Sequence, residues 1–372
     1  MMFFCTLLLG CISASAAVND VNMTTKKPNK NGFPLLPAGV TVSNPAPHPP
    51  LQIVGGTETA GPVGYMVGLG YSAKGSTSNA IFCGGSLIAP NIVLTAAHCL
   101  SSQQEVELYS VIVNAHDITN TSGVEAIRLN PGVLGENIIM HHSYDEDTME
   151  NDVALMILPY DVTGITYAQI NEDDNIPGQD GDRLRIIGWG TTSSGGEMSD
   201  ILLEAEVEYT LNEQCNDAYS KKDGDAIADG MMCAANDGID TCQGDSGGPM
   251  MLASDEGDPV QVGIVSWGYG CAHPDYPGVY TRVSYYADWI KETACAFTGH
   301  FCPTCDTSQK LMKVIVHTDS WPDETSWEVT SACEKSSDSI MSGGPYESRL
   351  ATLVTVDCVP EGEYEFTIEV SA

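Results

Sequence analysis

Three short segments, far apart in the chain, each carry one residue type that acyl-transfer chemistry needs. A histidine lies in Leu94-Thr-Ala-Ala-His98-Cys99, an aspartate in Asn151-Asp152-Val-Ala-Leu155, and a serine in Gly244-Asp245-Ser246-Gly247-Gly248-Pro249. A serine hydroxyl is a weak nucleophile until a neighbouring imidazole takes its proton. The imidazole in turn needs a buried carboxylate that fixes its tautomer and stabilises its charged form. Together, these three residues would form a complete nucleophilic centre.

Each of the three residues also has a structural explanation when it is taken alone. His98 beside a cysteine could be a packed core histidine, and Asp152 could be a turn residue. Ser246 lies in a glycine-rich stretch that could reflect turn chemistry only. The joint presence of all three within their flanking residues favours the catalytic interpretation.

Short strands are the elements expected to position these residues. From residue 53 the chain consists of short apolar runs separated by Gly, Pro and Asn, a texture that predicts an all-β sandwich or barrel. The clearest runs are 65–71, 83–89, 91–99, 152–158, 183–190 and 260–268. The exception is 284–292, whose apolar spacing predicts a helix that closes this region.

The order and the flanking residues of the three motifs resemble the chymotrypsin and trypsin family of serine proteases. The resemblance covers about residues 53–296 and includes Ile53-Val54-Gly55-Gly56, Ser266-Trp267-Gly268 and Pro277-Gly278-Val279-Tyr280-Thr281. It implies two packed antiparallel six-stranded β-barrels with a C-terminal helix. His98 and Asp152 would come from the first barrel and Ser246 from the second. The implied activity is that of a serine endopeptidase.

Residue-by-residue matching to the family implies further site residues. The peptide N–H groups of Gly244 and Ser246 would form the oxyanion hole, and Ser266 would donate a hydrogen bond to Asp152. Asp240, six residues before Ser246, would lie at the bottom of the substrate pocket. Gly268 and Gly278 match the walls of that pocket, and Ser266 begins Ser266-Trp267-Gly268, which resembles the family's substrate-binding edge strand. A carboxylate in a narrow pocket predicts cleavage of protein and peptide substrates after Arg or Lys.

The resemblance also implies a zymogen. Cleavage would free the α-amine of Ile53, which would then pair with the carboxylate of Asp245. The bond to be cut is Gln52–Ile53, and neither Lys nor Arg occurs anywhere in 31–52. We therefore expect an activating protease whose specificity differs from that of this enzyme.

The ends of the chain and its charge indicate a secreted protein. Residues 1–17 are typical of a signal peptide, and 18–52, rich in Pro, Asn and Thr, is typical of a propeptide or linker. The net charge of −35 argues against nucleic-acid partners and anionic membranes. Asn22 and Asn120 stand in glycosylation acceptor patterns.

The sequence contains thirteen cysteines, which is consistent with secretion. Cys5 and Cys11 leave with the signal peptide, and the remaining eleven, an odd number, should mostly pair in an oxidising compartment. The resemblance implies three disulfides, namely Cys83–Cys99, Cys215–Cys233 and Cys242–Cys271. The sequence does not assign partners to Cys295, Cys302, Cys305, Cys333 and Cys358. The CxxC spacing of Cys302 and Cys305 is compatible with zinc or redox chemistry, but in a secreted chain without a companion CxxC it favours a structural disulfide framework.

Beyond Cys295 the runs 313–319, 325–331, 351–358 and 364–370 predict a small β-rich module spanning 302–372. Its last run ends two residues before the end of the sequence, so truncation of this module stays open. The module could bind a protein or a polysaccharide, and the protease region could be a pseudoprotease that kept only the fold. We expect no cofactor. We also expect no metal, since by the resemblance Ala115 replaces the first calcium ligand, with only Asp117 and Glu125 left nearby.

Overall fold

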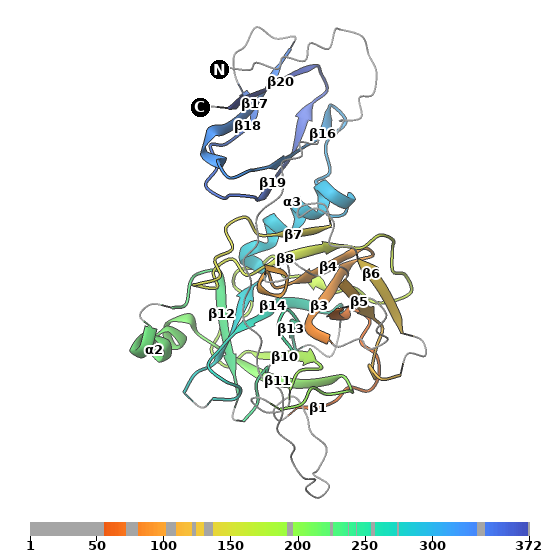
Figure 1. The fold of residues 1–372 in the computed structure, drawn as a ribbon, viewed down its shortest axis with the longest axis vertical. Coiled ribbons are helices and arrows are strands. Elements are labelled where there is room, and N and C mark those ends of the chain that lie inside the picture. The colour runs from red at the N-terminus through yellow and green to blue at the C-terminus, as the bar shows by residue number, and fades with distance from the viewer. Residues whose placement is uncertain are drawn as a thin grey trace, which may run out of the picture.

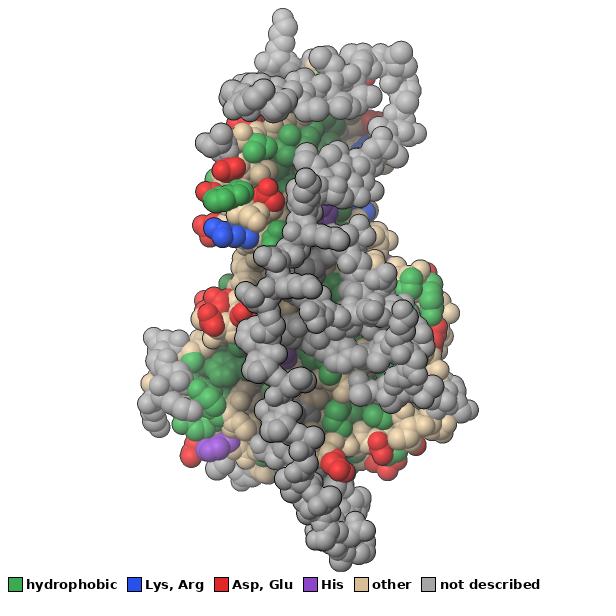
Figure 2. Space-filling model, in the orientation of Figure 1, with side chains coloured by type: hydrophobic (Ala, Val, Ile, Leu, Met, Phe, Trp, Pro, Cys, Tyr) green, Lys and Arg blue, Asp and Glu red, His purple; other side chains and the backbone are tan. Residues whose placement is uncertain are grey.

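The computed structural model describes residues 56–71, 81–101, 109–120, 124–129, 137–191, 196–223, 226–236, 238–242, 244–253, 257–273, 275–332 and 339–370. The predicted signal peptide and propeptide, and the activation residue Ile53, lie outside these residues. Within the described part, no helix is long and apolar enough to cross a lipid bilayer. Acidic side chains are visible over both ends of the molecule in Figure 2, and basic ones are few on that face.

The first sheet runs in the order β6-β5-β2-β3-β4-β8-β7, with antiparallel neighbours throughout. Its strands are β2 (Met66–Tyr71), β3 (Ile81–Ala89), β4 (Ile92–Thr95), β5 (Tyr109–Val113), β6 (Glu125–Leu129), β7 (Ile138–Met140) and β8 (Ala154–Ile157). All four residues of β4 are buried, as expected of a strand enclosed on both faces. The short helix α1 (His98–Ser101) follows β4.

The second sheet runs β1-β11-β10-β13-β14-β15-β12, and a pairing of β11 with β12 closes six of these strands into a barrel. Its strands are β1 (Thr57–Glu58), β9 (Gln169–Ile170), β10 (Arg183–Gly188), β11 (Leu203–Thr210), β12 (Met231–Ala235), β13 (Pro249–Leu252), β14 (Val260–Trp267) and β15 (Gly278–Arg282). In β11, buried Leu203, Ala205, Val207 and Tyr209 alternate with partly or fully exposed residues. This period of two places the apolar side chains inside the barrel.

The predicted all-β fold of two barrels followed by a helix and a β-rich module is confirmed (Figure 1). The helix predicted over 284–292 is a 3-10 turn, η1 (Ser284–Tyr286), that continues into α3 (Ala287–Thr298). A second helix, α2 (Asn212–Asp223), was not predicted. Its sequence is mostly polar, and of its residues only Cys215 and Tyr219 are buried in the described part. Two apolar contacts one turn apart are too weak a pattern to identify a helix.

The C-terminal module consists of two small sheets, β16-β19 and β18-β17-β20. Its elements are β16 (Gln309–His317), η2 (Pro322–Glu324), β17 (Thr325–Ser331), β18 (Ser339–Gly343), β19 (Thr352–Pro360) and β20 (Tyr364–Val370). Trp327, Val329, Met341 and Val359 form its buried core. In Figure 1 the module lies beyond α3, at the end of the molecule away from β1.

Two disulfides and one hydrogen bond hold the module against the end of α3. Cys295 in α3 pairs with Cys302, and Cys305 pairs with Cys358 in β19. The ammonium group of Lys313 in β16 donates to the carbonyl oxygen of Cys295 at 2.5 Å. Both members of the CxxC pair are therefore structural cystines. Cys333, the remaining cysteine, lies outside the described residues.

We predict that the module is dispensable for hydrolysis of small peptides. A chain ending after Pro303 keeps the Cys295–Cys302 disulfide and all candidate site residues, which precede Cys295. Its turnover of an Arg-amide substrate should stay within about twofold of the full chain, because substitutions remote from a site change little. Loss of turnover in a truncated protein with an unchanged circular dichroism spectrum would show that the module is part of the protease.

Candidate active site

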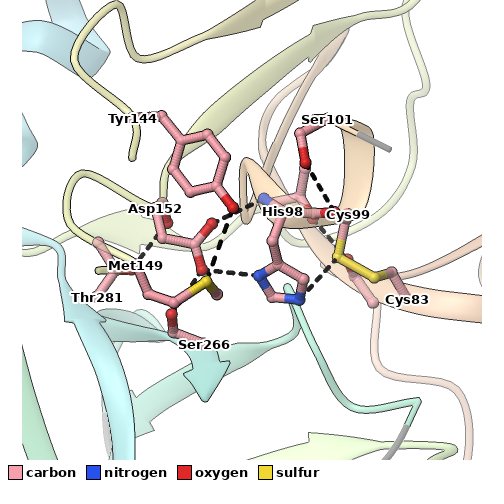
Figure 3. Close-up of polar contacts among 11 residues, drawn as sticks. Cys83, His98, Cys99, Ser101, Tyr144, Met149, Asp152, Ser266 and Thr281 are labelled. Atoms are coloured by element: carbon pink, nitrogen blue, oxygen red, sulfur yellow. Dashed lines mark hydrogen bonds and ion pairs between the residues drawn. A yellow bond between two sulfur atoms is a disulfide. The ribbon is translucent and has the colours of Figure 1, made fainter. Parts of the chain in front are cut away.

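His98 and Asp152 form a directly hydrogen-bonded pair. His98 begins α1, three residues after the end of β4, and Asp152 lies two residues before the strand β8 that pairs with β4. The Nδ1 atom of His98 lies 2.7 Å from Oδ2 of Asp152, and the peptide N–H of His98 donates to Oδ1 at 2.8 Å (Figure 3). These two contacts fix both the imidazole and the loop that carries it. Since a carboxylate accepts at Nδ1, the proton resides there and Nε2 is the acceptor.

Asp152 itself is buried, with 1% of its surface exposed, and is held by the second barrel. The hydroxyl of Ser266 donates to Oδ2 at 2.5 Å, as the resemblance implied. The hydroxyl of Thr281 donates to the carbonyl oxygen of Asp152 at 2.7 Å. No role for Thr281 was predicted, although the residue was noted within the segment Pro277–Thr281. Two hydroxyls from β14 and β15 thus lock the aspartate of the first barrel onto the second (Figure 3).

Ser246 lies in the turn before β13, against the segment that carries His98. Its carbonyl oxygen accepts from the N–H of Gly84 at 2.7 Å. The next residue, Gly247, has a φ of +77°, and a Cβ there would lie 2.3 Å from Oγ1 of Thr95 and 3.0 Å from Sγ of Cys99. Only glycine fits that approach. The two barrels therefore bring Ser246 next to the His98 segment.

The Nε2 atom of His98 is directed towards Sγ of Cys99, at 3.7 Å. Among the described residues it accepts no hydrogen bond from the Ser246 hydroxyl, so this contact of the triad is not formed here. Unliganded catalytic sites often show such long contacts, which shorten when substrate binds. Although Cys83, His98 and Cys99 cluster, the two sulfurs are bonded to each other and provide no thiolate for a metal.

The backbone beside Ser246 presents free donors. The peptide N–H groups of Gly244 and Ser246 donate to no atom of the described residues. Gly244 has a φ of +98°, and a Cβ there would lie 2.7 Å from the methyl carbon of Met198 and 3.2 Å from Cα of Gly190. A glycine is therefore required for this loop geometry. The arrangement suits an oxygen atom that accepts from both N–H groups.

Asp245 is fully buried behind this loop. Its carboxylate accepts from the N–H of Gly190 at 2.8 Å and from that of Cys242 at 3.0 Å. No basic group of the described residues forms an ion pair with it. Burial raises the pKa of Asp245 to about 7. Its predicted partner, the amine of Ile53, lies outside the described residues.

Asp240 is buried beside Gly278 at the position predicted for the bottom of the substrate pocket, and Asp240, Gly268 and Gly278 are together called the recess. Asp240 is 6% exposed, and within the described residues its carboxylate accepts from the N–H groups of Thr241, at 2.8 Å, and Ala272, at 2.9 Å, and from the hydroxyl of Thr241 at 3.5 Å. Burial raises its pKa to about 6. A Cβ on Gly278 would lie 2.7 Å from its Oδ1, and one on Gly268 would lie 3.7 Å from Cα of Gly278. The two glycines thus stand opposite each other above an uncompensated carboxylate.

A cluster of aromatic rings beside this recess was missed in the sequence. Tyr219 in α2 contacts the rings of Trp267, Tyr269 and Tyr276 at centroid distances of 5.0–5.4 Å. Its hydroxyl donates to the carbonyl oxygen of Pro277 at 2.6 Å. The helix α2 therefore braces the segment before Gly278. The disulfides Cys215–Cys233 and Cys242–Cys271 hold α2 and the recess in place.

The fold consists of two β-barrels, with the pair His98 and Asp152 and the nearby Ser246 where the barrels meet. These features together define a serine protease. Residues 53–290 match the sequence model of the trypsin family, and the chain belongs to that family. It is 36% identical over 250 residues to "Trypsin-1" of Astacus astacus, an alignment that covers 65% of this chain and all of the crayfish protein. It is 37% identical to "Trypsin 5G1" of Aedes aegypti, covering 65% and 85% of the two chains. It is 35% identical to "Trypsin eta" of Drosophila melanogaster, covering 66% and 90%.

We predict that the protein does not depend on calcium at the loop that includes Ala115. Ala115 is buried, with 1% exposed, and offers no side-chain oxygen. Oδ1 of Asp117 accepts from both the N–H and the hydroxyl of Thr119, at 2.8 and 2.6 Å. Since Ca²⁺ needs six or more oxygen ligands, thermal midpoints in calcium and in EDTA should agree within about 2 °C. A larger fall in EDTA would contradict the prediction.

Proposed function

We propose that the protein is a secreted endopeptidase that cleaves after Arg or Lys. Asp240 carries this proposal, because the donors to its buried carboxylate within the described residues are all neutral, namely two peptide N–H groups and the Thr241 hydroxyl, and because it lies beside Gly278. A long cationic side chain would supply the missing countercharge, and a guanidinium would do so with two parallel hydrogen bonds. The relatives named trypsins support the same substrate class.

In the proposed reaction Ser246 is the nucleophile and His98 the general base. Oγ of Ser246 attacks the scissile carbonyl carbon while Nε2 of His98 takes its proton, and the carbonyl oxygen moves between the N–H groups of Gly244 and Ser246. Asp152, 2.7 Å from Nδ1, stabilises the imidazolium that forms. The same imidazolium then protonates the leaving amine, which leaves an acyl group on Ser246. Water, activated by His98, hydrolyses this ester and restores the serine.

The specific test is covalent labelling of the nucleophile. A fluorophosphonate probe should label the activated protein at Ser246, and both labelling and peptide hydrolysis should disappear in Ser246→Ala. The hydrolysis rate of that variant should fall by at least about a thousandfold, because the covalent pathway is lost. Ser199→Ala, a serine outside the site, should keep full labelling. If the activated wild-type protein is not labelled, the pseudoprotease interpretation is correct.

The proposal also includes that the protein is secreted and that it is synthesised as a zymogen. Five disulfides join described residues, which supports maturation in an oxidising compartment. The buried carboxylate of Asp245, with no basic partner among the described residues, supports activation through the amine of Ile53. The C-terminal module is proposed as a separate unit that binds a protein or a polysaccharide. Its exposed Trp321, 61% accessible, could contact such a partner.

A further inference from the structure

A pocket of about 420 Å³ lies outside the candidate active site, where the start of α2 meets the end of β15. Its polar wall is formed by Tyr209, Asn212 and Arg282, and carboxylates stand around it. The helix α2 and the strand β12 mark this side of the second barrel in Figure 1. None of its lining residues belongs to the triad, the oxyanion loop or the recess above Asp240.

The cation in this pocket, Arg282, has only neutral partners. Its Nη2 donates to the hydroxyl of Tyr209 at 2.9 Å and to Oδ1 of Asn212 at 3.5 Å. Its guanidinium also lies over the ring of Tyr209, 5.6 Å from the centroid. It forms no ion pair with any carboxylate of the described residues. In a chain with 50 acidic and 15 basic residues, such an arginine retains donors for an external anion.

Acidic side chains at the same pocket restrict what that anion can be. Asp174, Glu213 and Asp229 line it and are exposed, and none of them forms an ion pair within the described part. A simple anion would be repelled by these carboxylates and by the net charge of −35. A simple cation would be repelled by Arg282. The pocket therefore fits a ligand that carries both a carboxylate and a cation.

We propose that this pocket binds the carboxy-terminal Lys or Arg of a peptide. The α-carboxylate pairs with Arg282, and the side-chain cation reaches the carboxylates of Asp174, Glu213 and Asp229. The preceding residues of the peptide leave the pocket past Tyr285, whose side chain is 56% exposed. The physiological source of this ligand rests on the proposed function, because cleavage after Arg or Lys creates such an end at every bond cut.

The pocket lies on the same strand, β15, that holds Asp152, so a peptide bound in the pocket stays close to the catalytic residues. Arg282 follows Thr281, whose hydroxyl holds the carbonyl oxygen of Asp152. Successive side chains of a strand point to opposite faces, so the pocket and Asp152 lie on the two sides of β15. A cleaved substrate held by its new end would stay on the enzyme while its remaining bonds reach Ser246.

Calorimetric titration of full-length Ser246→Ala with Nα-acetyl-lysine tests the proposal. Saturating benzamidine, an aromatic cation without a carboxylate, keeps the recess above Asp240 occupied. We expect one binding site, and a Kd that rises at least about tenfold when Arg282→Gln is added, since a charge-assisted pair is lost. Adding Arg183→Gln instead, which removes an exposed arginine paired with Glu206, should leave the Kd unchanged.

Two analogues of Nα-acetyl-lysine, each of which lacks one of its two charges, serve as control ligands. Nα-acetyl-lysine amide lacks the carboxylate and Nα-acetyl-norleucine lacks the ammonium, and each should bind at least about tenfold more weakly. The double variant Glu213→Gln/Asp229→Asn, altered only at exposed positions, should weaken the binding of Nα-acetyl-lysine but not that of Nα-acetyl-norleucine, and it decides the question if Arg282→Gln does not fold. Absence of binding, or equal binding of the amide, overturns the proposal. These affinities do not depend on which bond the enzyme cleaves, so a failure of the Arg and Lys specificity would be seen separately, in peptide hydrolysis by the wild-type protein.

Discussion

Replacement of Asp240 by serine should lower kcat/KM for Arg-amide and Lys-amide substrates by about a thousandfold, since removal of one partner of a desolvated charge pair costs several kcal/mol. The loss follows from the surroundings of Asp240. Asp240 is 6% exposed, and the described groups that hydrogen-bond to its carboxylate, two peptide N–H groups and the Thr241 hydroxyl, are all neutral. A substrate cation in the variant would be taken out of water and given no countercharge. Steady-state kinetics with matched Arg, Lys and Phe amides would measure the change.

Asp275→Ser is the matched control for this prediction. Asp275 is an exposed carboxylate in the segment between Cys271 and Gly278, so its loss changes the net charge equally without touching the recess. Its kinetics should stay within about twofold of wild type. A variant Asp240→Ser that kept its preference for Arg and Lys over Phe would show that another carboxylate selects the substrate.

The catalytic pair could be predicted from sequence because its chemistry restricts both residue types and flanking residues. His98 follows the carboxyl end of β4 and Asp152 precedes the amino end of β8, and the antiparallel pairing of these strands, whose apolar runs were visible in the sequence, brings both residues to the same end. Gly244 and Gly247 were similarly recognisable, since both adopt positive φ where a side chain would collide with neighbours. For these residues, the local sequence motif alone was sufficient to predict where each lies in the fold.

The missed features depend on contacts between distant segments. The hydrogen bond from Thr281 to Asp152 joins residues 129 positions apart in the sequence, and that from Tyr219 to Pro277 joins residues 58 positions apart. The polar helix α2 is positioned by a disulfide and by Tyr219, not by an apolar stripe. The strand β18 was also missed, because Ser339–Gly343 is short and contains two serines and a glycine. Residue type alone does not reveal such pairings.

The partners of Cys295 and Cys358 could not be assigned for a related reason. Cys302 and Cys305 are close in sequence, yet each pairs with a cysteine of a different element, α3 and β19. Spacing predicts whether two cysteines can meet but not which of several neighbours they choose. The packing of the module against α3 decides which cysteines pair. Lys313 contributes to this packing through its hydrogen bond to the carbonyl oxygen of Cys295.

Trypsin should fail to activate the proposed precursor, and Gln52→Arg should make that precursor activatable by trypsin. Asp245 is buried among backbone groups, and its pKa is raised to about 7 by that burial. Near neutrality the carboxylate is therefore only partly ionised until a cation joins it, and an unpaired buried charge costs about 3–5 kcal/mol. The ammonium group of a freed Ile53 would supply that cation and stabilise the loop from Cys242 to Ser246.

The sequence before Ile53 blocks the usual route to this cation. The bond to be cut follows Gln52, no Lys or Arg occurs in 31–52, and Lys27 is followed by Pro28. An enzyme that requires Arg or Lys cannot release Ile53, so neither added trypsin nor the protein itself should do so. We therefore expect a protease of different specificity to perform the step.

The experiment incubates the purified precursor with trypsin, blocks trypsin with a protein inhibitor that binds neither the precursor nor its activated form, and then assays an Arg-amide substrate. Wild-type activity should remain at least about a hundredfold below that of trypsin-treated Gln52→Arg, in line with the cost of the unpaired charge. Gln52→Ala is the control, because it changes the same residue without creating a trypsin site. Amino-terminal sequencing should find Ile53 only in the arginine variant. Strong activity in trypsin-treated wild type with Ile53 as its new amino terminus would disprove the mechanism, whereas activity with another terminus would show that Asp245 finds its cation elsewhere.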